Sequence, residues 1–107
     1  MTPEKAVQNA IVDYLKSEAK KGKPIYVERR QAGGFSYKMG IPDLYAVYNG
    51  QHIEIEVKAP GKSLRPMQEK WRDKCKMLNI KYVCADNIDD IKLLFAELSD
   101  VNQTQRE

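Results

Sequence analysis

The sequence is poor in the residues that bind zinc or form disulfide frameworks. Its 107 residues include one histidine, His52, and two cysteines, Cys75 and Cys84. A structural zinc site takes about four such ligands, commonly with a CxxC spacing that is absent here. Two cysteines are also too few for a disulfide framework, so we expect two reduced structural thiols. A zinc protein and a disulfide-stabilised secreted module are therefore not expected.

Long hydrophobic runs are also absent. No segment approaches the roughly 18 apolar residues of a membrane span, and the amino terminus lacks the apolar stretch of a signal peptide. We therefore expect a cytoplasmic protein. The length suits one compact domain. We place it at residues 1–99 and expect a polar, disordered tail over residues 100–107.

Charge of one sign is in only slight excess. The formal net charge is +3, which suits a polyanionic partner without requiring one. The basic residues either keep the surface soluble or contact nucleic-acid phosphates. Aromatic residues also alternate with Lys38 after a Gly-Gly turn, which fits a nucleic-acid contact or loop packing equally. The residues that we predict to contact nucleic-acid phosphates are Arg29, Arg30, Lys38, Lys62 and Arg65.

Periodicity and turn residues predict an α/β domain with a mixed central sheet flanked by helices. Thr2 and Pro3 are typical of a helix start, and Pro66 can begin a second helix. In chain order we expect a helix that fades by Gly22, a strand over residues 25–30, two strands joined at Asn49-Gly50, the helix from Pro66, a strand over residues 81–85 and a helix over residues 88–98.

The hairpin around Asn49-Gly50 predicts a charged cluster. Asn-Gly favours a two-residue type I′ turn, and counting from it places Asp43 directly opposite Glu56. Lys58 follows Glu56 by two residues and shares its face of the sheet. Opposed carboxylates repel, and a hard divalent cation such as Mg²⁺ would neutralise them. The alternative is an ordinary half-exposed strand, in which charged residues simply face water.

These residues also form an ordered pattern. Gly40-Ile41-Pro42-Asp43 followed by Glu56-Val57-Lys58 resembles the PD-(D/E)XK nuclease superfamily, and most of all its VRR-NUC branch in the stand-alone form found in phages. That branch resembles this chain also in an early glutamate on a helix, here Glu4, and a glutamine on a later helix, here Gln68. The likeness spans about residues 3–98. It implies a restriction-endonuclease-like fold and an endonuclease that hydrolyses DNA.

The resemblance also implies roles for individual residues. Asp43, Glu56, the backbone carbonyl of Val57 and, through water, Glu4 would hold one or two Mg²⁺ or Mn²⁺ ions. Lys58 would orient or deprotonate the attacking water, and Gln68 would support the nucleophile or the scissile phosphate. The likeness to junction resolvases further implies a homodimer that acts on branched DNA such as four-way (Holliday) junctions.

Several alternatives remain open on the residues alone. Glu4 suits compensation of a helix dipole, Gln68 a surface amide and His52 a solvated imidazole. Arg65 stands where relatives commonly carry a small hydroxyl residue, which puts a side-chain helix cap in doubt. The competing functions are a nuclease without junction preference and a non-catalytic nucleic-acid-binding module, whose affinity would not depend on metal.

Overall fold

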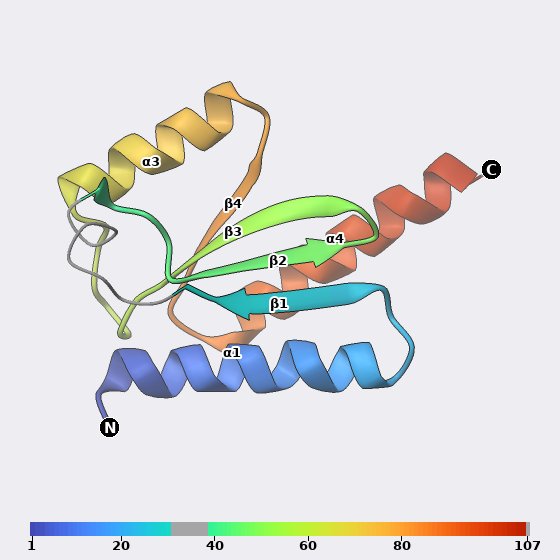
Figure 1. Cartoon of the computed structure of the whole chain (residues 1–107), viewed down its shortest axis with the longest axis horizontal. Coiled ribbons are helices and arrows are strands. Elements are labelled where there is room, and N and C mark those ends of the chain that lie inside the picture. Colours follow the sequence, from blue (N-terminus) through green and yellow to red (C-terminus); the bar gives the residue numbers. More distant parts are fainter. Residues whose placement is uncertain (31–38, 107) are drawn as a thin grey trace.

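The computed structural model describes residues 1–30 and 39–106 and contains a four-stranded mixed sheet with helices on both faces (Figure 1). The strand order is β1-β2-β3-β4, with β1, β2 and β3 antiparallel and β4 parallel to β3. This α/β architecture is consistent with the predicted restriction-endonuclease-like fold. The elements are α1 (Pro3–Lys20), β1 (Ile25–Arg29), β2 (Leu44–Tyr48), β3 (Gln51–Val57), α3 (Pro66–Met77), β4 (Lys81–Ala85) and α4 (Ile88–Arg106).

The first helix begins as its sequence predicts. The Thr2 hydroxyl accepts the backbone N–H of Lys5 at 3.1 Å, and Pro3 occupies the first turn, where its missing N–H costs nothing. The apolar stripe of α1 packs with α4 against one face of the sheet (Figure 1). The core formed there includes Ile11, Leu15, Leu44, Ala46, Ile53, Ile55, Val57, Ile91 and Phe95.

The predicted hairpin is confirmed in turn type and register. Asn49 and Gly50 both have positive φ, 49° and 84°, as a type I′ turn requires. Tyr48 pairs with Gln51, and Leu44 pairs with Ile55. The two strands therefore present their alternate apolar side chains to the core, as the counting predicted.

The charged face of β3 is buried, so the half-exposed strand is ruled out. Glu54, Glu56 and Lys58 are only 4%, 2% and 8% exposed. The helix α3 lies on this side of the sheet, opposite to α1 (Figure 1), and its first turn contacts Glu56. Charges buried to this degree need partners, which makes the contacts of each one informative.

Three expectations concern the ends of segments. The strand predicted over residues 25–30 ends at Arg29, and the backbone of α4 is helical to Arg106, past the predicted end at Leu98. The division into a domain of residues 1–99 and a disordered tail stays a prediction.

The predicted Gly-Gly turn and Lys38 lie outside the described residues. In the part of the chain that the structure describes, no helix combines the length and the apolar character needed to cross a membrane.

Candidate active site

The two predicted carboxylates lie opposite each other where β2 and β3 reach the edge of the sheet. The backbone N–H of Asp43 points to Oε2 of Glu56 at 3.4 Å, which continues the pairing of Leu44 with Ile55 by one residue. Asp43 is half-buried and Glu56 is buried. Pro42 precedes Asp43 and keeps it out of the strand's ladder, because proline has no N–H to donate.

In the part of the chain that the structure describes, the charge of this pair is only partly compensated. Burial, and then the neighbouring Asp43, raise the pKa of Glu56 to about 8. Burial, and then Glu4, raise the pKa of Asp43 above its ordinary value. Lys58 opposes both shifts, yet across residues 1–30 and 39–106 neither carboxylate forms a salt bridge. Without another cation, Glu56 therefore holds its proton more tightly than an ordinary glutamate does.

Gln68 holds Glu56 from the first turn of α3. Its side chain is 5% exposed, so it is no surface amide. The amide oxygen accepts the backbone N–H of Arg65 at 2.8 Å, and the amide nitrogen donates to Oε1 of Glu56. The first bond fixes which end of the amide meets the carboxylate. The doubt about Arg65 as a cap is also resolved, because a guanidinium has no acceptor and Gln68 instead bonds the backbone of Arg65.

Gly40 explains how α3 comes so close. Its φ is +71°, and a Cβ at this position would lie 2.5 Å from the backbone C and O of Met67 and 2.7 Å from the N of Gln68. Only glycine permits both this conformation and this approach. The Gly40 that opens the predicted motif therefore positions α3, and with it the amide of Gln68.

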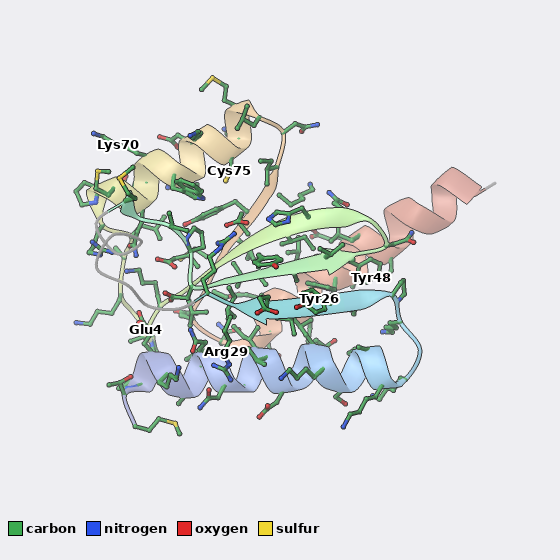
Figure 2. All side chains as sticks on the ribbon, in the orientation of Figure 1. Glu4, Tyr26, Arg29, Tyr48, Lys70 and Cys75 are labelled. Atoms are coloured by element: carbon green, nitrogen blue, oxygen red, sulfur yellow. The ribbon has the colours of Figure 1, made fainter. Side chains whose placement is uncertain are left out.

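Glu4 and Lys58 complete the group. Glu4 lies in the first turn of α1 (Figure 2). Its charge raises the pKa of both Asp43 and Glu56. Glu4 therefore lies at the positive end of the α1 dipole and also acts on the two carboxylates. Lys58 follows β3 directly and its backbone N–H donates to the Ala85 carbonyl at 2.9 Å. The buried ammonium acts electrostatically on both carboxylates.

The predicted DNA-contacting residues do not form one cluster. Arg30 donates two hydrogen bonds to Glu54, at 2.6 and 2.7 Å, on the α3 side of the sheet. Arg29 points to the opposite side and donates to Gln8 of α1 at 2.8 Å. The alternation of side chains along a strand requires this separation and was readable from the sequence. Lys62 is exposed in the loop before α3, whereas Lys38 lies outside the described residues.

His52 is separate from the carboxylate pair. Its Nε2 bonds to Glu54, and its ring stacks on Tyr45 with centroids 5.2 Å apart. Its side chain is partly exposed, as expected for a solvated imidazole. Its pairing with a buried glutamate was not predicted, because no short-range pattern indicates it.

The side chains alone do not form a complete metal site. Within the described ranges, no three His, Cys, Asp or Glu side chains are grouped closely enough to hold a metal ion. Any ion between Asp43 and Glu56 would therefore need backbone oxygen atoms or water as further ligands.

Comparison with known families agrees with this geometry. A family model described as the VRR-NUC domain matches residues 4–87 of the 107-residue chain. The chain belongs to the VRR-NUC family. The VRR-NUC match begins at Glu4 and extends past Gln68, so it covers the whole group of residues described above, and it identifies a nuclease-type domain. A comparison with curated protein sequences gives no match.

Proposed function

We propose that this chain is a metal-dependent endonuclease that hydrolyses phosphodiester bonds in DNA. The observation that carries the proposal is the carboxylate pair itself. Asp43, which is half-buried, and Glu56, which is buried, are brought together and form no salt bridge among the described residues. Such a pair is costly unless a cation neutralises it. Its place in a nuclease-type domain favours a catalytic cation over a purely structural one.

The donor atoms near the pair fit Mg²⁺ or Mn²⁺, because both ions prefer oxygen ligands. Asp43 and Glu56 would bind directly, and Glu4 through water. One or two bound ions would supply positive charge at the phosphate and lower the pKa of a bound water.

The backbone carbonyl of Val57 is the further ligand that we propose. Hydrogen-bonded pairs alternate along an antiparallel ladder, and the register of β2 and β3, continued by two residues from Leu44 and Ile55, places Pro42 opposite Val57. Pro42 has no N–H with which to bond that carbonyl. This supports an oxygen available to a cation at the same edge as the carboxylates.

Lys58 and Gln68 have distinct proposed roles. Lys58 would orient the attacking water or accept its proton at Nζ, since it is buried beside both carboxylates. The amide of Gln68 is already bonded to Glu56 and Arg65. We therefore propose that Gln68 acts by positioning the Glu56 carboxylate. The family resemblance implied a different role, in which Gln68 supports the nucleophile or the scissile phosphate.

We further propose that phosphates of the substrate contact Arg29, Lys38, Lys62 and Arg65. Arg30 would instead order the sheet through Glu54.

We also propose that two copies of the chain act together on branched DNA. Each chain offers one carboxylate pair, whereas a four-way junction has approximate two-fold symmetry and requires two cuts. A symmetric dimer supplies two such sites.

One gel assay tests the nuclease proposal. Labelled four-way junction, flap, duplex and single-stranded DNA would each be incubated with the protein in Mg²⁺, Mn²⁺ or EDTA. We expect cleavage that requires metal and is lost in Asp43→Ala and Glu56→Ala. Asp89→Ala, which removes an exposed carboxylate in the first turn of α4, should cleave like wild type.

Two outcomes would refute the proposal. Full cleavage by either Asp43→Ala or Glu56→Ala would remove the carboxylate site. Binding without any product, and with the same affinity in metal and EDTA, would instead support a non-catalytic nucleic-acid-binding module.

A further inference from the structure

Two cations share a neutral acceptor on the α1 side of the sheet. Nζ of Lys5, in the first turn of α1, and Nη1 of Arg29, at the end of β1, each donate to Oε1 of Gln8 at 2.8 Å. Figure 2 shows Arg29 between the end of β1 and α1. Because both nitrogens contact the same oxygen atom, the two positive charges lie within a few ångströms of each other.

No salt bridge pairs these charges in residues 1–30 and 39–106. Neither Lys5 nor Arg29 forms a salt bridge there, and both side chains are exposed. Like charges at short range repel, so the arrangement favours an anion that meets both. Of the three donors of a lysine and the five of an arginine, one each is used by Gln8, which leaves donors available.

The pair lies beside the proposed active site. The charge of Lys5 lowers the pKa of Asp43, so the ammonium is close enough to act on that carboxylate. Arg29 pairs across the sheet with Leu44, the residue next to Asp43. A polyanionic strand that approaches Glu4, Asp43 and Glu56 meets their negative charge, and adjacent cations would offset that repulsion.

We infer that Lys5, Gln8 and Arg29 form a phosphate clamp. The clamp holds the backbone phosphate of the DNA that is adjacent to the scissile phosphate. The inference rests on the proposed nuclease function. Charge-assisted bonds from an ammonium and a guanidinium suit a phosphodiester oxygen. Gln8 orders the two long side chains before DNA arrives, which lowers the entropy cost of binding. None of the roles assigned above includes Lys5 or Gln8.

The test measures DNA binding separately from cleavage. Fluorescence anisotropy of a labelled duplex in EDTA, over a series of KCl concentrations, would compare wild type with Lys5→Ala, Lys5→Arg and Gln8→Glu. Lys16→Ala is the matched control, because Lys16 is exposed on the same helix about 16 Å further along its axis. Thermal unfolding of each variant would confirm that it folds.

We expect Lys5→Ala to weaken binding and to reduce the slope of log affinity against log salt by about one. Lys5→Arg should restore most of the affinity, because it keeps the charge. Gln8→Glu should weaken binding at least as much as Lys5→Ala, since the new carboxylate would neutralise both cations. Lys16→Ala should match wild type in affinity and slope.

Equal affinities and slopes for Lys5→Ala and Lys16→Ala would overturn the clamp, as would a wild-type protein that does not bind DNA. Cleavage measured in the gel assay would then still support the nuclease function. If Lys5→Ala loses the expected slope but wild type cuts nothing in Mg²⁺ or Mn²⁺, the clamp stands as a DNA-binding element and the nuclease proposal fails.

Discussion

Two glutamates on the same face of β3 illustrate how partners determine a residue's role. Glu54 is buried, which by itself would raise its pKa, but Arg30 and His52 outweigh that effect and lower the pKa. Glu56, two residues later, accepts a bond from a neutral amide and faces a second carboxylate, and its pKa rises to about 8 although Lys58 opposes the shift. Glu54 therefore belongs to a satisfied ion pair, whereas Glu56 forms no salt bridge within the described residues.

The free energy of unfolding of the metal-free protein should fall as pH rises toward about 8. Because the pKa of Glu56 in the folded state lies above its ordinary value of 4.5, the folded state binds this proton more tightly. The resulting stability is fully present below the unfolded pKa and is lost as pH rises through the folded pKa. The slope should not exceed about 1.4 kcal/mol per pH unit for this one group.

Urea unfolding in EDTA at several pH values would measure this dependence in wild type and Glu56→Gln. The glutamine cannot ionise, so its profile should be flatter. Mn²⁺ added near pH 8 should stabilise wild type and have little effect on Glu56→Gln, because a bound ligand stabilises only the state that binds it. Superimposable pH profiles would show that Glu56 keeps an ordinary pKa.

Lys58→Ala should abolish cleavage and still bind metal, because an ammonium is not a metal ligand. Lys58→Arg should restore cleavage poorly, since a guanidinium does not accept a proton near neutral pH. Isothermal titration with Mn²⁺, alongside the gel assay, would separate the two properties. Loss of metal affinity together with activity would contradict the assigned role of Lys58.

At the scale of whole elements, the site depends on how closely α3 approaches the segment before β2. Gly40 brings the first turn of α3 against the backbone at the entry to that strand, and Gln68 then reaches Glu56 on β3. The helix thus contributes to the carboxylate pair through one amide, although it begins at Pro66, far along the chain from Gly40. Because the backbone of Gly40 packs directly on the backbone of Met67 and Gln68, this contact fixes how far α3 lies from the segment before β2.

Gly40→Ala should therefore be more damaging than Gly61→Ala. Both glycines have positive φ, 71° and 82°, but a Cβ at Gly61 meets nothing within 4 Å. Gly61→Ala should cost only the backbone strain of about 1–2 kcal/mol and retain cleavage. Gly40→Ala should cost more and slow cleavage, because the first turn of α3 must move. Urea unfolding and cleavage rates would measure both; equal losses would contradict the close approach.

At the scale of the whole molecule, charge is unevenly placed. The net charge is only +3, yet the carboxylates gather at one edge of the sheet, and exposed cations such as Lys5 and Arg29 lie directly beside them. A bound metal would neutralise the carboxylates, and a DNA phosphate would neutralise the cations. This arrangement suits a protein whose metal and substrate bind next to each other.

The proposed dimer should cut a junction at symmetric positions. Light scattering at working concentration would give the oligomeric state, and nicks would be mapped on a four-way junction with a fixed crossover. Two sites related by a dyad should nick opposing strands at equivalent places. A monomer that cuts linear duplex as readily as junctions would retain the metal chemistry and remove the junction preference.

The sequence by itself determined the parts of this protein that depend on short-range geometry. The Asn49-Gly50 turn sets the hairpin register within a few residues, so Asp43 opposite Glu56 followed from counting. The start of α1 followed from Thr2 and Pro3 for the same reason. The identity of the family followed from motif order, which needs no coordinates.

Only the tertiary structure decided which charges are satisfied. The pairing of Arg30 with Glu54 and of Arg29 with Gln8 joins residues 24 and 21 positions apart, and each depends on how separate elements pack. The burial of Glu56 likewise required α3 to cover the second face of the sheet, held there through Gly40. Local patterns specify which way a side chain points, but its partners come from long-range packing.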